Sequence, residues 1–139
     1  MWDVVLSSGK LLYGIAVDDA HTFKQPWNRN SAQPGRGWVV VRTDRLSTTA
    51  ILDALERGNF YASTGVELSD YQTTDKDMTV TIKQEGSSKY RVLFIGKGGR
   101  VLREVITNSA VYEYLGEKCM CALRSLNRME KLPGLSRSG

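Results

Sequence analysis

The residues best suited to chemistry in this chain are a carboxylate and an imidazole that follow an apolar run. Asp19 and His21 come directly after residues 11–17, whose composition is that of a buried strand. Side chains two residues apart on an extended segment point to the same side, so this carboxylate and this imidazole can grip one divalent cation. We expect the neighbouring Asp18 to hydrogen-bond the backbone of the turn and not the metal.

The histidine count limits this candidate metal site. His21 is the only histidine among 139 residues, which excludes a metal centre built from several imidazoles. A single histidine, with no second residue of the arrangement identified, does not indicate a Ser-His-Asp nucleophile site. Cys119 and Cys121 also stand two residues apart and could join Asp19 and His21 in a four-ligand zinc site. Nothing in the sequence forces the two pairs together, so the sequence favours buried structural cysteines.

Two arginines are candidates for contact with phosphate. Arg36 lies in a segment rich in proline and glycine, and Arg42 ends an apolar run that predicts a strand over 38–42. A guanidinium matches the geometry of phosphate oxygens, so both could face a phosphate-bearing small molecule if the chain were part of an intact barrel; the alternative at each position, and the default, is an arginine that faces only solvent. The glycine-rich segment 96–100 lacks the Gly-Lys-Ser/Thr ending of a phosphate loop and predicts a hairpin turn.

Charge and cysteine usage narrow the class of protein. The formal charge is +4, from 19 Lys and Arg against 15 Asp and Glu, and the basic residues are scattered along the chain. Scattered charge predicts a solvated surface and makes nucleic acid an unfavoured partner, with a polyanion-binding β module as the weakest hypothesis. The sequence predicts no membrane span, no secretion signal and no disulfide framework, so we expect a cytoplasmic protein.

The apolar pattern predicts an α+β protein in two parts, divided near Gly65. Residues 1–65 are predicted to form a β-loop-β-α segment behind a short helix. The predicted elements, in chain order, are a helix over 1–10, a strand buried on both faces over 11–17, a loop over 22–37, a strand over 38–42 and a helix capped by Ser47. Residues 66–131 alternate apolar and polar side chains, which predicts antiparallel hairpin strands over 78–83, 90–95, 101–107, 110–115 and 118–124. Residues 132–139 are expected to form a flexible tail.

Four ordered blocks in the first part resemble a known family. They are Trp2-Asp3 and residues 13–21, 37–42 and 50–65, and together they resemble the C-terminal end of PHP-domain metallohydrolases, in particular the CehA/McbA-like branch. The β-rich part is weakly similar to a small appendage of that branch. The resemblance implies the end of a β/α barrel in which Asp19 and His21 supply metal ligands.

The resemblance also implies that most of the metal site is missing. The family's His-x-His motif and its other ligands lie upstream of the matched blocks, so the chain resembles the last portion of a phosphoesterase-like enzyme without its N-terminal half. Two ligands do not make a catalytic zinc, manganese or iron site, so we expect a vestigial pair, no cofactor in isolation and no catalysis by this chain alone. The alternative is a working part of a metal-dependent phosphoesterase, completed by an upstream half or a partner chain.

A barrel reduced to its last units leaves unpaired strand edges and an uncovered apolar face. We therefore expect a homo-oligomer whose symmetric contact buries Trp2, Trp38, Ile51 and Leu55. The expected role is that of a self-associating or binding module.

Overall fold

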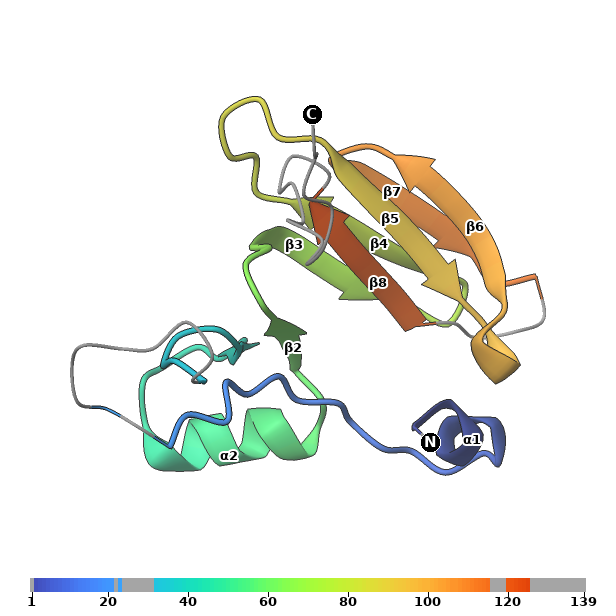
Figure 1. The fold of residues 1–139 in the computed structure, drawn as a ribbon. Helices are drawn as coiled ribbons and strands as arrows, with labels where there is room; N and C mark the ends of the chain where they lie inside the picture. Colours follow the sequence, from blue (N-terminus) through green and yellow to red (C-terminus); the bar gives the residue numbers. More distant parts are fainter. Residues whose placement is uncertain (1, 22, 24–31, 116–119, 126–139) are drawn as a thin grey trace, which may run out of the picture. The chain divides into compact units, whose positions relative to one another are not determined.

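The computed structural model describes residues 2–21, 23, 32–115 and 120–125, and its architecture is α+β and rich in antiparallel strands (Figure 1). The chain divides into two compact units, Met1–Glu67 and Leu68–Gly139, close to the change of pattern at Gly65. The predicted tail over 132–139 lies outside the described residues. None of the described helices has the length and apolar character needed to cross a membrane.

The N-terminal unit is built around a two-stranded ribbon and one helix. Its elements are α1 (Trp2–Ser7), β1 (Trp38–Val41), α2 (Thr48–Glu56) and β2 (Phe60–Ser63). The strands β1 and β2 pair antiparallel, with Trp38 opposite Ser63 and Val41 opposite Phe60. The predicted cap is confirmed, because the Ser47 hydroxyl accepts a hydrogen bond from the amide of Ala50 at 3.3 Å. The pattern did not predict β2, since four residues are too few to show a period.

The prediction of a strand over 11–17, buried on both faces, is wrong. The segment carries no strand pairing, and Ile15 and Val17 are 65% and 67% exposed. Gly14 and Ala16, which alternate with them, are half-buried. Beyond Tyr13, the small residues face the rest of the unit, so the β-branched side chains of Ile15 and Val17, which suggested a core strand, face outward.

Two close contacts hold this segment along the ribbon. The ring of Tyr13 packs edge-on against Phe60, with centroids 5.7 Å apart, and it lies so near Gly58 that an added Cβ would stand 2.4 Å from it. At Gly37, an added Cβ would stand 2.9 Å from the carbonyl oxygen of Val17. Gly58 precedes β2 and Gly37 precedes β1, and because the two strands are antiparallel, these glycines lie at opposite ends of the ribbon. Residues 13–17 therefore run from one end of the ribbon to the other.

The C-terminal unit is a sandwich of two three-stranded sheets. One sheet has the order β3-β4-β7, from β3 (Leu68–Thr73), β4 (Asp77–Ile82) and β7 (Ser109–Glu113). The other has the order β6-β5-β8, from β6 (Val101–Ile106), β5 (Tyr90–Ile95) and β8 (Met120–Ser125). Figure 1 shows the two layers one behind the other, and every strand pair is antiparallel.

The described core of the sandwich consists of alternate residues from the two central strands, β4 and β5, and from the edge strand β7. The rings of Phe94 and Tyr112 stack at 5.1 Å and join the two sheets. Phe94, Val80 and Val92 are the largest fully buried side chains. The predicted period of two is therefore confirmed for β4, β5 and β7, whose buried apolar residues are Met78, Val80, Ile82, Tyr90, Val92, Phe94, Ala110 and Tyr112.

The predicted hairpins are only partly right. Of the strands adjacent in sequence within this unit, β3 pairs with β4 and β5 pairs with β6, whereas the connections from β4 to β5, β6 to β7 and β7 to β8 cross between the sheets. Strands that each bury one face need a second layer of structure packed against that face. A single sheet of consecutive hairpins would leave the apolar face uncovered. The segment 86–88 is thus a crossover loop, held by the Gln84 amide, which donates to the carbonyl oxygens of Gly86 and Ser88 at 2.8 and 2.9 Å.

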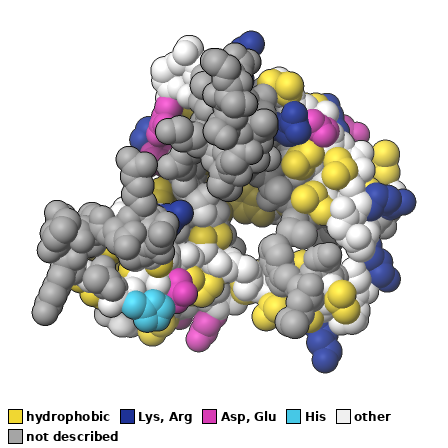
Figure 2. Space-filling view, viewed as in Figure 1, with side chains coloured by type: hydrophobic (Ala, Val, Ile, Leu, Met, Phe, Trp, Pro, Cys, Tyr) yellow, Lys and Arg dark blue, Asp and Glu magenta, His cyan; other side chains and the backbone are white. Residues whose placement is uncertain are grey.

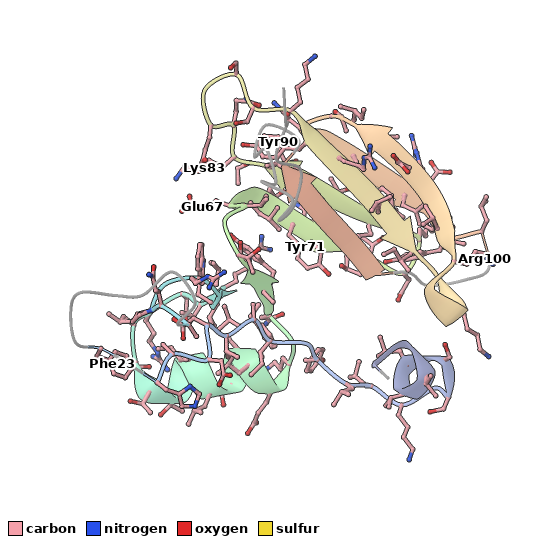
Figure 3. The ribbon with its side chains drawn as sticks, viewed as in Figure 1. Phe23, Glu67, Tyr71, Lys83, Tyr90 and Arg100 are labelled. Atoms are coloured by element: carbon pink, nitrogen blue, oxygen red, sulfur yellow. The ribbon has the colours of Figure 1, made fainter. Side chains whose placement is uncertain are left out.

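One strand was not predicted because a β-bulge breaks its period. In β3, Leu68 is opposite Ile82 and Tyr71 is opposite Val80, with a register shift between residues 68 and 70. Because of the extra residue, Leu68 and Tyr71, which are three positions apart in β3, stand opposite two residues of β4 that are only two positions apart. The hairpin turn predicted at 96–100 is confirmed: a short 3-10 helix, η1 (Lys97–Gly99), joins β5 to β6, and Arg100 stands at that end of the hairpin in Figure 3.

Candidate functional site

The candidate metal ligands lie together in the turn that follows residues 11–17. Asp19 has a φ of 53°, in the left-handed region that aspartate tolerates better than most residues. The Nδ1 atom of His21 lies 2.7 Å from the carbonyl oxygen of Asp19. A carbonyl oxygen only accepts, so Nδ1 is the donor in this contact, and in the neutral tautomer with the proton on Nδ1 the lone pair lies on Nε2. The turn thus leaves the outer nitrogen of His21 available for a metal.

The two side chains can serve as half of a metal site. Nε2 of His21 lies 3.8 Å from Oδ1 of Asp19, close to the separation of about 3.4 Å between two donors of a tetrahedral zinc. The side chains of His21 and Asp19 are 80% and 84% exposed, and Figure 2 shows the imidazole in cyan at the surface beside acidic atoms.

Within the described part of the chain, His, Cys, Asp and Glu side chains form no group of three or more that could hold a metal. Among the described residues, Asp19 and His21 therefore lack the third protein ligand that a catalytic zinc centre needs. Cys119 lies outside the described residues, and only the backbone of Cys121, in β8, is described. The four-ligand zinc alternative accordingly stays a prediction.

Asp18 holds the two ends of a long connection together. Its Oδ2 accepts a hydrogen bond from the amide of Gly35 at 2.7 Å, and its Oδ1 accepts one from the amide of Ala20 at 3.3 Å. These two amides lie at the two ends of the segment 20–35. Asp18 therefore fixes the turn in which Asp19 and His21 stand, through backbone contacts.

Asp18→Ala is expected to lower the stability of the N-terminal unit by about 1 kcal/mol, because Gly35 and Ala20 each lose an acceptor. Urea unfolding followed by tryptophan fluorescence measures the loss, and hydrogen exchange of the Gly35 amide locates it. Asp19→Asn is the matched control, since it keeps both hydrogen bonds and tolerates the same backbone conformation. Equal exchange rates at Gly35 in the two variants would contradict this role.

The two candidate phosphate contacts are not brought together. Arg36 follows the turn that Asp18 holds, and Arg42 comes directly after Val41, so they stand at opposite ends of β1. Arg42 instead lines a polar hollow with Arg45 and Arg57. Sequence spacing gave no signal for this group, because the three arginines share no helical or strand period.

Ser63, in the last of the four sequence blocks, has a local structural role. Its hydroxyl is buried, donates to the carbonyl oxygen of Val66 at 2.7 Å and accepts from the amide of Gly65 at 3.1 Å. These bonds hold the turn that leads out of β2. The hydroxyl is thus engaged by backbone groups.

The predicted contact residues for self-association are already partly covered. Trp38, Ile51 and Leu55 are half-buried within the N-terminal unit, and the side chain of Trp2 lies outside the described part. More exposed apolar side chains occur elsewhere in the unit: Val4, Leu11, Leu12, Tyr13, Ile15, Val17, Phe23, Leu46 and Leu52. The surface available for a partner therefore lies mainly on the segment that was expected to be buried.

Comparison with family models, with curated proteins and with solved structures finds no match for this chain. The resemblance to PHP-domain metallohydrolases therefore depends on the four sequence blocks alone.

Proposed function

We propose that this chain is a PHP-like metallohydrolase segment that is inactive alone and works as a module associating with a second copy of itself. In this proposal the N-terminal unit corresponds to the end of a β/α barrel and the C-terminal unit to its appendage. The mild charge and the absence of a disulfide framework in the sequence favour a cytoplasmic location and no dedicated polyanion partner.

One observation carries the proposal. Ile15, Val17, Asp19 and His21, which we call the outward row, are all exposed, whereas the residues between them are half-buried. The outward row thus presents two β-branched side chains followed by two metal donors. Apolar side chains exposed in a contiguous row are typical of surfaces that another protein covers.

A second copy of the chain would cover the apolar side chains of the outward row and would supply further metal donors. A two-fold contact lets Ile15 and Val17 of one protomer cover the same residues of the other. If the two-fold axis passes beside Asp19, the carboxylate and imidazole of the second copy lie next to Asp19 and His21 of the first. Two copies then provide four donors, the number that zinc takes in structural sites.

Light scattering at high micromolar concentration tests the association. We expect the wild type to have the mass of a dimer and Val17→Asp to have the mass of a monomer, because an aspartate pair in an apolar contact is unfavourable. Val101→Asp is the matched control: Val101 is 52% exposed on β6, and this substitution should leave the mass unchanged. A monomeric wild type, with or without added zinc, would contradict the proposal.

The alternative is completion by a chain that carries the missing ligands, which would give a phosphoesterase that uses zinc, manganese or iron. The exposure of the Asp19–His21 pair also suits this alternative. Phosphodiesterase turnover by the purified chain in added metal, abolished by His21→Ala, would favour it over the inactive module. A dimer whose formation zinc promotes, and which shows no turnover, would favour self-association.

A further inference from the structure

Two edge strands of the sandwich are interrupted by β-bulges. Among the described strands, the edges are β3 and β7 in one sheet and β6 and β8 in the other. A bulge breaks the register of β3 between Leu68 and Asp70, and another breaks the register of β6 beside the step from Phe94 to Ile95. Bulges at a sheet edge oppose pairing with a further strand.

A charged side chain closes the edge of a third strand, β7. The amide of Tyr114, just after β7, donates to the carbonyl oxygen of Lys76 at 2.7 Å, so alternate main-chain groups of β7 face β4 and those of Val111 face away from it. The guanidinium of Arg103, from β6, donates to the carbonyl oxygen of Val111 at 2.6 Å. Arg103 therefore occupies this edge and joins β7 to β6.

The fourth edge strand, β8, has no interruption of its register. All of its residues pair with β5, from Ser125 opposite Tyr90 to Met120 opposite Ile95, without a shift. Figure 1 shows β8 on the side of β5 that faces away from β6, and no described strand pairs with the other side of β8.

The hydrogen bonds of β5 show which groups of β8 face this open side. The carbonyl oxygen of Tyr90 accepts from the amide of Thr107, just after β6, at 3.1 Å. Hydrogen-bonding groups alternate between the two sides of a strand, so even-numbered residues of β5 face β6 and odd-numbered ones face β8. The β8 residues opposite the odd-numbered ones are 120, 122 and 124. The amides and carbonyl oxygens that point away from β5, which we call the outer edge of β8, therefore belong to Cys121, Leu123 and Ser125.

The inner side of the sandwich has room for apolar side chains next to this edge. Since Arg103 ties β6 to β7, the edges on the other side of the sandwich are β8 and β3. On β3, Leu68 and Tyr71 lie opposite the buried residues Ile82 and Val80, yet both are only half-buried. A strand added to β8 with apolar residues at alternate positions would extend the core toward them.

Charge indicates the other face of such a strand. Arg91 and Arg124 are in register on β5 and β8, and like charges directly opposite each other destabilise a strand pair. Glu104 of β6 lies 3.2 Å from Arg91 and supplies one negative charge there. A carboxylate on a strand added to β8 would bring a second negative charge to these two arginines.

We propose that the outer edge of β8 binds an extended segment of another protein, which adds a strand to this sheet. The segment has apolar residues at alternate positions and an acidic residue opposite Arg124. Residues 126–132 of this chain do not have that pattern, because their apolar residues Leu126, Met129 and Leu132 are three apart. A second copy paired through β8 would supply no carboxylate, since β8 contains no acidic residue.

Titration of the isotope-labelled full chain with a synthetic peptide, followed by NMR, tests the site. The peptide is about as long as β8 and alternates valine with threonine, with glutamate in place of a central threonine. We expect saturable shifts, and slower amide exchange at Cys121, Leu123 and Ser125. The same peptide methylated on its backbone nitrogens should bind about tenfold more weakly, because it cannot donate to the carbonyl oxygens of the outer edge. Equal binding of the two peptides would contradict the proposal.

Two substitutions at one position provide a matched comparison in the protein. Leu123→Pro removes an amide of the outer edge, whereas Leu123→Ala shortens the side chain and keeps that amide. Leu123→Pro should bind the peptide about tenfold more weakly than Leu123→Ala, with circular dichroism showing that both variants are folded.

Three results would overturn the proposal. The first is equal affinity of the two folded Leu123 variants, and the second is no saturable binding to the wild type. The third is slow exchange at the outer edge in the free wild type: slowing at every concentration would assign the edge to residues 126–139 of the same chain, and slowing that grows with concentration would assign it to a second copy. Val17→Asp should bind the peptide as the wild type does, because the outward row lies in the other unit.

Discussion

Gly58→Ala is expected to destabilise the N-terminal unit by about 2–4 kcal/mol. Two independent causes combine at this position. Its φ of 73° lies in the left-handed region, which disfavours any residue with a Cβ. The added methyl would also stand 2.4 Å from the ring of Tyr13, so that ring must move away from Phe60.

Double substitution separates the two causes. In a Tyr13→Ala background the ring is gone, so Gly58→Ala should cost only its backbone part, about 1–2 kcal/mol. Gly35→Ala is the matched control, because its φ is 80° and an added Cβ meets nothing within 4 Å. Urea unfolding followed by tryptophan fluorescence reports on this unit, since Trp2, Trp27 and Trp38 all lie in it. A Gly58→Ala cost no larger than that of Gly35→Ala would show that Tyr13 does not pack there.

Phe94→Ala is expected to destabilise the C-terminal unit by about 3–5 kcal/mol, enough to unfold a marginally stable domain. Phe94 is fully buried near the end of β5, the central strand of its sheet, and stacks on Tyr112 across the sandwich. Its removal leaves a cavity between the two sheets and ends that ring contact. The β-sheet signal in circular dichroism should fall at lower urea than in the wild type.

Two comparisons locate this effect in the sandwich core. Ile106→Ala, at an exposed position of β6, should cost less than about 0.5 kcal/mol. Tryptophan fluorescence should report little change for Phe94→Ala, because the three tryptophans lie in the other unit. Loss of the tryptophan signal together with the β-sheet signal would mean that the two units unfold as one.

Much of the secondary structure could be predicted from local pattern. The helix α2 has its cap at Ser47 and its apolar stripe at helical spacing, and both signals depend on neighbours in sequence. The strands β4 and β5 alternate buried with half-buried residues, and β7 alternates buried with exposed residues, as their sequences indicate. The bulge in β3 and the short β2 were missed because neither has an uninterrupted period.

The candidate sites were less predictable than the elements. The sequence placed Asp19 beside His21 because their spacing is local. It could not show that Arg42 would meet Arg45 and Arg57, since the turn after β1 and the end of α2 bring them to one hollow. It also grouped Arg36 with Arg42, although β1 separates them.

The sequence by itself determined the α+β class, the division near Gly65, the cap of α2 and the period of the core strands. Only the tertiary structure decided which strands pair, that two sheets face each other, and that Ile15 and Val17 point outward. The physical reason is that periodicity shows which side chains share a face but not what covers it. Pairing and burial depend on contacts between residues far apart in the chain, and Tyr13 against Gly58 and Phe94 against Tyr112 are two such contacts.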